Sequence, residues 1–147
     1  MSQFEVFLAE DNLDHAHLAT ECLRSGKPDI DIGHFPDGPS LLSALKARTD
    51  CGRVMPNLLL LDLNMPGMDG FEVLATIKKN TALRSIPVVV ISTSKMVEDI
   101  RRALLLNANS YSVKSMDYEL WERTLLGIRD YWCEIDQTHR LRDMRSE

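Results

Sequence analysis

Short apolar runs alternate along the chain with longer stretches in which apolar residues recur every three or four positions. The short runs are typical of β-strands, and the longer spacing is typical of helices with one buried face. We expect strands at residues 4–9, 29–35, 57–62, 86–91 and 110–113. We expect helices at residues 12–25, from 39 past 45, around 71–77, from 94 to about 107, and from about 117 past 131. This alternation predicts an α/β fold, a doubly wound (βα)5 unit with a parallel sheet and helices on both faces.

Residues at the starts of three predicted helices fit a helix start, and two of them fit the role of an N-cap. Asp37 stands two residues before Pro39, and proline suits the first turn of a helix. Asp69 is followed three residues later by Glu72, which is the spacing of a capping box. We expect Ser94 to cap the fourth helix.

The third predicted strand is a run of leucines that ends in Asp62. A strand with no charge before its last residue is typical of the interior of a parallel sheet, where both faces are buried. The turn-forming residues from Asn64 to Gly67 end the strand at once. Asp62 is thereby held at the carboxyl end of a strand, where open α/β sheets carry their ligand sites.

Other polar residues follow the neighbouring strands, and in a parallel sheet all of these ends lie at one edge. In chain order the strand ends carry Glu10, Asp11, Asp62, Ser92 and Lys114. Clustered acidic side chains repel one another, so such a crevice needs a cation. Mg²⁺ suits it, because this ion takes one or two carboxylates together with phosphate oxygens.

Asp62 is the central acid of this crevice and the best candidate nucleophile, because carboxylates form aspartyl phosphates. Lys114 would supply fixed positive charge to the phosphoryl group, and Ser92 a hydrogen bond. Two other functions stay open at this point: a Mg²⁺-dependent phosphatase with an aspartate nucleophile, and a structural interaction module that accepts no phosphate. The phosphatase would normally need a second acid where Asn64 stands, and the intact polar set argues against the module.

Composition narrows the classes of function. The chain of 147 residues fits one domain, and its net charge of −5 argues against general nucleic-acid binding. No apolar stretch approaches the length of a membrane span. Cys22, Cys51 and Cys133 are far apart and odd in number, which fits reduced thiols better than a disulfide framework or a zinc site. We expect a cytoplasmic protein with no nucleic-acid or membrane partner.

Four segments resemble the receiver domains of two-component response regulators. They are Ala9-Glu10-Asp11-Asn12, Leu60-Leu61-Asp62-Leu63-Asn64-Met65-Pro66-Gly67-Met68-Asp69-Gly70, Ile86-Pro87-Val88-Val89-Val90-Ile91-Ser92 and Tyr111-Ser112-Val113-Lys114. The resemblance covers about residues 4–133 and implies a flavodoxin-like fold with strand order 2-1-3-4-5. We expect a receiver domain at residues 1–135 and a polar C-terminal tail at 136–147.

The resemblance also implies a role for each site residue. Asp62 matches the phospho-acceptor, Lys114 the invariant lysine, and Ser92 the hydroxyl residue that follows the phosphoryl group. Tyr111 matches the switch aromatic that turns inward when this hydroxyl moves. The Mg²⁺ ligands implied are Glu10, Asp11, Asp62 and the backbone carbonyl of Asn64. The chain would then be a phospho-acceptor rather than an enzyme, with a histidine kinase or phosphotransfer protein as donor.

One departure from the family pattern concerns the residue after the lysine. Ser115 stands where the family usually has proline, and a cis bond before any other residue costs about 3 kcal/mol. The sequence therefore leaves open whether the Lys114–Ser115 bond is cis, and Ser115 could instead help to cap the last helix. The tail and the Leu-Asp-Leu-Asn-Met-Pro segment are similar to regulators paired with bacterial phytochrome-type kinases.

Two apolar features suggest a protein partner. Residues 103–106 are consecutive apolar residues on the fourth predicted helix, which cannot bury all of them against one sheet. Trp132 and Ile135 extend the apolar stripe of the last helix beyond the usual receiver length. We hypothesise a homodimer through the fourth helix, fifth strand and fifth helix, with the extension packed on the partner.

Overall fold

The computed structural model describes residues 4–135 of the chain. Its strands are β1 (Glu5–Ala9), β2 (Asp31–Phe35), β3 (Leu58–Asp62), β4 (Val88–Ser92) and β5 (Ser110–Val113). Its helices are α1 (Leu13–Arg24), α2 (Gly38–Cys51), α3 (Gly70–Lys79), α4 (Val97–Leu105) and α5 (Tyr118–Asp130), followed by a π-helical turn at Tyr131–Ile135. All strand pairs are parallel and the order is β2-β1-β3-β4-β5, so the predicted flavodoxin-like fold is confirmed.

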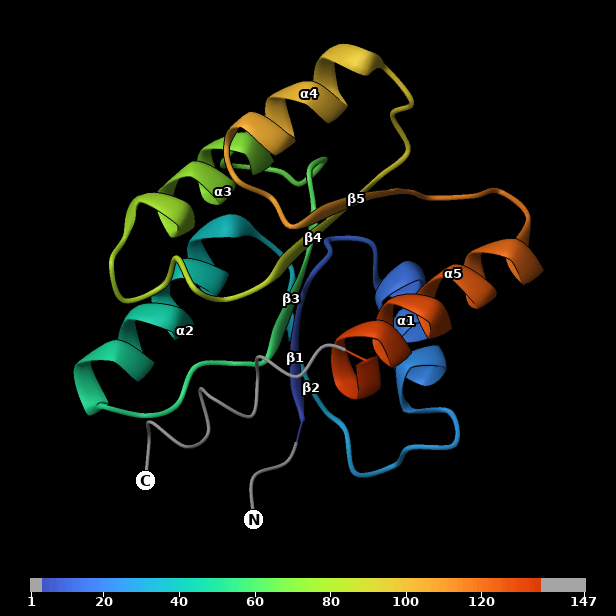
Figure 1. Cartoon of the computed structure of the whole chain (residues 1–147), viewed down its shortest axis with the longest axis horizontal. Helices are drawn as coiled ribbons and strands as arrows, with labels where there is room; N and C mark the ends of the chain where they lie inside the picture. Colours follow the sequence, from blue (N-terminus) through green and yellow to red (C-terminus); the bar gives the residue numbers. More distant parts are fainter. Residues whose placement is uncertain (1–3, 136–147) are drawn as a thin grey trace.

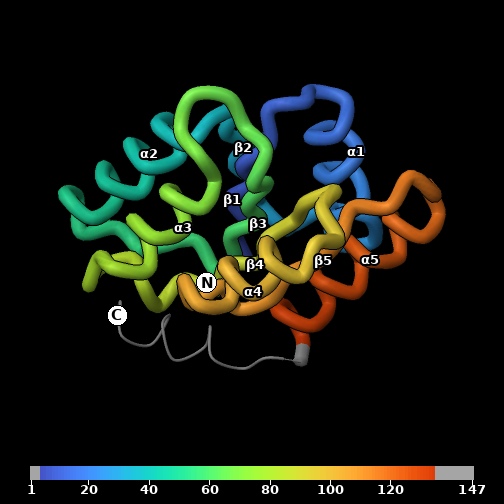
Figure 2. The backbone as a smooth tube through the Cα atoms, turned by 90° about the horizontal axis from the view of Figure 1, so that it is seen from above, coloured from blue at the N-terminus to red at the C-terminus, as the bar shows by residue number. Residues whose placement is uncertain are grey.

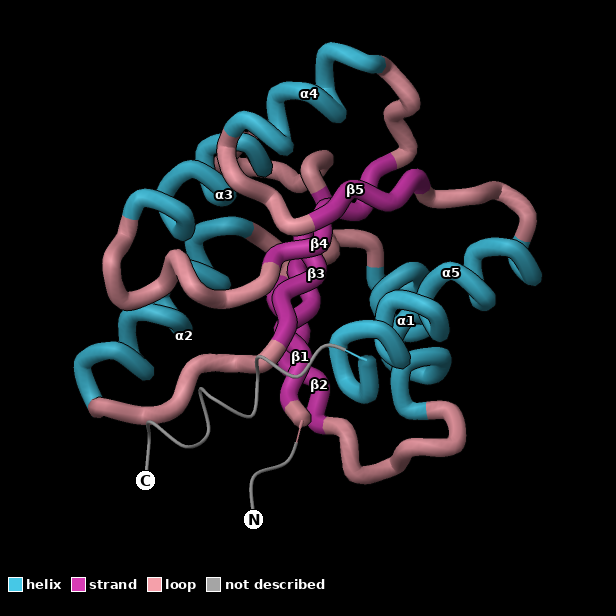
Figure 3. The backbone as a smooth tube through the Cα atoms, in the orientation of Figure 1, coloured by secondary structure: helices cyan, strands magenta, loops and turns pink. Residues whose placement is uncertain are grey.

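Three layers build the molecule, with the sheet in the middle. Helices α1 and α5 cover one face, and α2, α3 and α4 cover the other (Figure 1). Figure 2 shows the same layers after a turn of 90°, and Figure 3 shows the twisted strands stacked through the centre. Among the described residues, no helix has both the length and the apolar content of a membrane span.

The leucine run of β3 explains the two-sided core. Leu59 and Leu61 belong to the apolar cluster on the α2–α3–α4 face, while Leu58 and Leu60 belong to the cluster on the α1–α5 face. Successive strand side chains point to opposite faces, so a central strand without polar positions serves both clusters. Every residue of β3 is buried, Asp62 included.

The expected cap at Asp69 is confirmed, and Asp37 before Pro39 caps α2 as well. The side chain of Asp37 accepts a hydrogen bond from the Ser40 amide at 2.7 Å, and that of Asp69 accepts one from the Phe71 amide at 2.9 Å. The expected cap at Ser94 is wrong: α4 begins at Val97, after Met96, whose side chain makes no capping bond. At the other end, α4 stops at Leu105, two residues before the expected limit.

The hydroxyl of Ser94 has another partner, which explains why it does not cap. It donates to Asp99 Oδ2 at 2.6 Å and accepts from the Met96 amide at 3.2 Å. These bonds hold the residues before α4 in a turn, so the helix starts later than the sequence suggests.

A buried arginine joins the end of α5 to the end of α1. Arg129 is only 7% exposed, and its guanidinium donates to the carbonyl oxygens of Leu23 and Ser25 and to Asp130. These carbonyls are the unsatisfied acceptors of a helix end, so Arg129 stabilises both helices at once. Trp132 in the π-helical turn packs on the core of its own chain, beside this junction. The side chain of Ile135 lies outside the described residues.

Arg129→Leu is expected to lower the free energy of unfolding by about 2 kcal/mol, because these carbonyls lose their donor. Urea unfolding followed by tryptophan fluorescence measures the change. Arg123→Leu is the matched control, since Arg123 lies exposed on the same helix. Equal effects of both substitutions would contradict the role given to Arg129.

Candidate functional site

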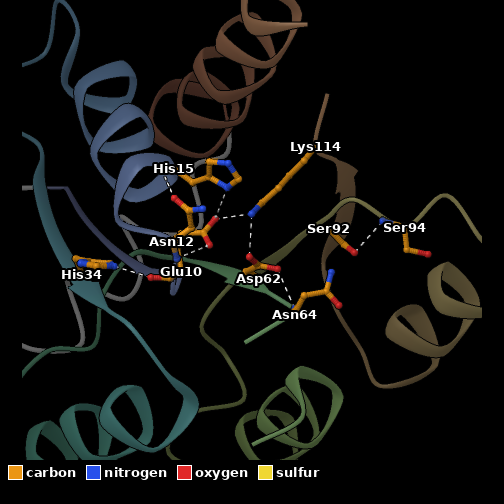
Figure 4. Close-up of polar contacts among 9 residues, drawn as sticks. All are labelled: Glu10, Asn12, His15, His34, Asp62, Asn64, Ser92, Ser94 and Lys114. Atoms are coloured by element: carbon orange, nitrogen blue, oxygen red, sulfur yellow. Dashed lines mark hydrogen bonds and ion pairs between the residues drawn. The ribbon is translucent and has the colours of Figure 1, made fainter. Parts of the chain in front are cut away.

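The polar residues predicted at the strand ends do come together. Ligand oxygens of Glu10, Asp11 and Asp62 lie within 4.8 Å of one another. The Lys114 ammonium donates to Asp62 Oδ2 at 2.8 Å and to Glu10 Oε1. Figure 4 shows Lys114 reaching these two carboxylates from the end of β5. Glu10, Asp62 and Lys114 are nearly buried, whereas Asp11 is exposed at the mouth of the crevice.

Backbone amides fix the carboxylates that Lys114 bridges. Asp62 Oδ1 accepts from the Asn64 amide at 2.9 Å, and Glu10 Oε2 accepts from the Asn12 amide at 3.2 Å. Each carboxylate is thus held on one oxygen by the chain that follows it and on the other by Lys114. This arrangement pre-orients both groups before any ligand binds.

Burial and mutual repulsion change the proton affinity of the site. Burial raises the pKa of Glu10 from 4.5 to about 7, with Asp62 adding to the rise and Lys114 opposing it. Burial by itself lowers the pKa of Lys114, but its hydrogen bonds to Asp62 and Glu10 outweigh this effect and the net shift is upward. The lysine therefore stays charged, and Glu10 is poised to exchange a proton near neutral pH.

A glycine keeps the loop after Asp62 in place. A Cβ atom at Gly70 would lie 2.5 Å from the Leu63 Cα and 2.7 Å from the Leu63 carbonyl oxygen. The start of α3 therefore packs directly on the backbone beside Asp62, at a distance that only glycine permits. This close approach gives a physical reason for the Gly70 of the motif.

The proposed switch residues, Ser92 and Tyr111, are linked through the backbone of Ser94. Ser92 Oγ accepts a hydrogen bond from the Ser94 amide at 3.1 Å, and the Tyr111 hydroxyl donates to the Ser94 carbonyl at 2.9 Å. As an acceptor in this bond, Ser92 keeps its own hydroxyl hydrogen for another partner. A movement of Ser92 would change the position of Ser94 and with it the support of Tyr111.

The peptide bond between Lys114 and Ser115 is trans. Ser115 Oγ accepts from the Asp117 amide at 3.0 Å, and the Asp117 side chain accepts from the Leu120 amide at 3.2 Å as the cap of α5. Ser115 thus contributes to the turn that leads into the helix, as one of the two sequence interpretations had it.

Sequence reasoning missed one residue at this site. His34 of β2 lies with its Nε2 atom 2.6 Å from the Glu10 carbonyl oxygen (Figure 4). His34 is far from Glu10 in the chain, and only the register of β1 and β2 places them side by side. No spacing within the sequence carries that information.

The sequence model of one protein family, described as the response regulator receiver domain, matches residues 6–124. The chain belongs to this family. The receiver is therefore a phospho-acceptor that takes a phosphoryl group on an aspartate, and its family implies a histidine kinase partner. The phosphatase alternative and the phosphate-free module are both set aside by this assignment. The predicted tail at 136–147 lies outside the described residues.

Relatives match over most of their length. The receiver is 40% identical over 129 residues to the probable methanogenesis regulatory protein FilR2 of Methanothrix harundinacea, covering 88% of this chain and 83% of that one. It is 35% identical to the response regulator Rcp1 of Synechocystis sp., covering 88% of each. The phosphorylated cyanobacterial phytochrome response regulator RcpA superposes with a TM-score of 0.85 at 34% identity, covering 92% of this chain and 98% of that one.

The acidic cluster of this receiver is a divalent-cation pocket. Its donors are hard carboxylate oxygens on three neighbouring residues, two of them buried around a single lysine, and such a set fits a divalent cation. The structure of Rcp1 in a Mn²⁺-bound form, with a TM-score of 0.84 at 34% identity and coverage of 92% and 98%, agrees with this assignment.

Cation binding is expected to weaken about tenfold from pH 8 to pH 6, because a proton on Glu10 must leave when the cation binds. The pKa of Glu10 sets this pH window, because it is about 7 in the folded chain and 4.5 for an ordinary glutamate. The same proton stabilises the fold: its contribution is fully present below pH 4.5 and is lost as the pH rises through about 7.

Calorimetric titration with Mg²⁺ at both pH values measures the effect. The isosteric variant Glu10→Gln has no proton to release, so its affinity should be weaker and nearly independent of pH. An equally steep pH dependence in Glu10→Gln would assign the proton to a different group.

Proposed function

We propose that Asp62 accepts the phosphoryl group from a phosphohistidine of a histidine kinase or phosphotransfer protein. The observation that carries this assignment is its position: Asp62 is the acid that both belongs to the carboxylate cluster and bonds to Lys114 from the end of the central strand. A carboxylate oxygen of Asp62 attacks phosphorus, the P–N bond to the histidine breaks, and its electron pair stays on the imidazole, which then takes a proton.

The surrounding residues divide the remaining work. We assign Glu10, Asp11, Asp62 and the backbone carbonyl of Asn64 as ligands of Mg²⁺, which when bound offsets the charge of the phosphoryl oxygens. Lys114 moves from the Asp62 oxygen to a phosphoryl oxygen as the new bond forms. Ser92 moves to donate its hydroxyl hydrogen to another phosphoryl oxygen. This movement takes its oxygen away from the Ser94 amide and lets Tyr111 turn inward.

The phosphoryl donor is assigned to a kinase of the phytochrome type. RcpA is described as a phytochrome response regulator, which supports this assignment. RcpA and Rcp1 also match nearly the whole length of the receiver. Autophosphorylated histidine kinases with and without a phytochrome sensor, each mixed with the receiver and Mg²⁺, test it. Transfer from the phytochrome kinase should be the fastest, and equal rates from all donors would refute the assignment.

Output is assigned to protein contacts through the face formed by α4, β5 and α5, with a second copy of the chain as the first partner. On α4, Ala103 is buried, but Leu104 is 50% exposed and Leu105 is 75% exposed, while the C-cap residue Leu106 packs on the core. On α5, Gly127 faces open space at the edge of a hollow of about 400 Å³ next to Tyr131 and Trp132. The exposed leucines of α4 and this hollow, which Asn109 and Ser110 also line, support a self-complementary contact.

Leu105→Lys is expected to convert a dimer into a monomer, because it places a charge in this apolar contact. Sedimentation at about 50 μM protein, with and without a phosphoryl mimic, gives the oligomeric state. Val54→Lys is the control, since Val54 is also exposed, at 43%, but lies between α2 and β3. A wild-type chain that stays monomeric in both conditions contradicts the dimer.

A further inference from the structure

The ladder of backbone hydrogen bonds between β1 and β2 lacks its last bond, the one that the Glu10 carbonyl would accept. The Asp31 amide donates to the Phe4 carbonyl at 3.0 Å, and the Glu10 amide donates to the Phe35 carbonyl at 2.9 Å. In a parallel pair, a residue whose amide donates to one residue of the next strand accepts at its carbonyl from the amide two residues further along. The Glu10 carbonyl would therefore accept from the amide two residues after Phe35. That residue is Asp37, where the chain leaves the sheet as the N-cap of α2.

The side chain of His34 stands where this last donor is missing. Its Nε2 atom lies 2.6 Å from the Glu10 carbonyl oxygen, and a carbonyl only accepts, so Nε2 carries the hydrogen. Glu10 is thereby held by β2 at its amide and at its carbonyl, while Lys114 and the Asn12 amide hold its carboxylate.

The bond acts on the junction of two acidic residues. The Glu10 carbonyl belongs to the peptide group that joins Glu10 to Asp11, so fixing its direction fixes how the two side chains lie relative to each other. Both carboxylates belong to the cation pocket. Glu10 is 2% exposed and cannot adjust freely, whereas His34 is exposed and adds little to the core.

We propose that His34 is a positioning residue of the cation pocket, in which its Nε2–H replaces the missing rung of the sheet and orients the Glu10–Asp11 peptide. The proposal rests on the proposed function in one respect, the assignment of Glu10 and Asp11 as ligands of the cation. Groups that orient metal ligands in this way are worth about tenfold or more in metal affinity.

Calorimetric titration with Mg²⁺ tests the proposal on four proteins: wild type, His34→Leu, His34→Gln and His17→Leu. His34→Leu should bind Mg²⁺ about tenfold more weakly. His34→Gln keeps an N–H donor of similar reach and should restore most of the affinity. His17→Leu is the matched control, because His17 is an exposed histidine of α1 that pairs with Glu21. It should bind like wild type.

Two further readouts separate positioning from general stability. Thermal unfolding of the metal-free variants should show small and similar drops in unfolding temperature for His34→Leu and His17→Leu. A large drop for His34→Leu alone, in proportion to its loss of Mg²⁺ affinity, would overturn the proposal. Nitrogen NMR of metal-free wild type should show His34 with its hydrogen on Nε2, and a hydrogen on Nδ1 alone would overturn it. This second readout needs no variant, so it decides even where His34→Leu does not fold.

Phosphorylating the same proteins with a small phosphodonor distinguishes a failure of the His34 proposal from a failure of the proposed function. If wild type binds Mg²⁺ but takes up no phosphoryl group, the proposed function fails and the calorimetry still decides on His34. If wild type is labelled and His34→Leu binds Mg²⁺ as tightly as wild type, the His34 proposal fails alone. A wild-type chain without Mg²⁺ affinity overturns both.

Discussion

Asp62→Asn is expected to abolish phosphoryl incorporation from a small phosphodonor in the presence of Mg²⁺. The amide has the shape of the carboxylate and still accepts from the Asn64 amide, so the fold is retained. Its nitrogen and oxygen carry no negative charge, and an amide oxygen is a poor nucleophile toward phosphorus. The loss therefore reports the missing acceptor.

Intact mass spectrometry after incubation with the phosphodonor measures this effect. Wild type should gain one phosphoryl group and Asp62→Asn none. Asp69→Asn is the matched control, because Asp69 lies in the same loop and asparagine caps a helix as well as aspartate does. Its phosphorylation should equal that of wild type. A normal mass gain in Asp62→Asn would place the acceptor at another residue.

Lys114→Met is expected to cause the second largest effect, a loss of about a hundredfold in the rate of phosphorylation. The ammonium is the fixed positive charge next to Asp62, and removing one such charge-stabilising group typically costs two to three orders of magnitude in rate, about 3–4 kcal/mol. The same change removes the shared partner of two buried carboxylates, so it should lower the free energy of unfolding by about 3 kcal/mol at pH 8 without a divalent cation.

The pH dependence of this variant gives a sharper test. Lys114 lowers the pKa of Glu10, so its loss raises that pKa further above 4.5 and Glu10 binds a proton more readily. The stability deficit against wild type should then shrink as the pH falls toward about 5. Added Mg²⁺ should reduce the deficit at pH 8, because the cation replaces the lost positive charge and so binds the variant more tightly than wild type.

Urea unfolding at both pH values, with and without Mg²⁺, measures the deficit. Lys79→Met, on the exposed side of α3, is the control and should change neither stability nor phosphorylation. A deficit in Lys114→Met that stays the same at every pH and Mg²⁺ concentration would show that packing, rather than charge, is lost.

Much of the fold follows from the sequence because strand and helix periods are local. The leucine run before Asp62 and the valine-rich run before Ser92 identify the central strands, and parallel topology then brings their polar ends to one edge. The predicted carboxylates and Lys114 meet there for that reason. Each of these conclusions needs only short stretches of chain and the rule that parallel strands share a direction.

The features that the sequence does not reveal depend on contacts between distant residues. Ser94 has the residue type of a cap, but its hydroxyl is engaged by Asp99. His34 reaches Glu10 only because β2 pairs with β1 in one register and ends where α2 begins. The raised pKa of Glu10 comes from burial first, and burial of a single side chain cannot be predicted from its neighbours in sequence.

The most direct test of the central claim is to locate the phosphoryl group chemically. Borohydride reduces an aspartyl phosphate to homoserine, and trypsin releases the segment 54–78, which contains both Asp62 and Asp69. Fragment sequencing of phosphorylated and reduced wild type should place homoserine at position 62 and at no other acid. Homoserine at position 69 or at position 11 would contradict the account.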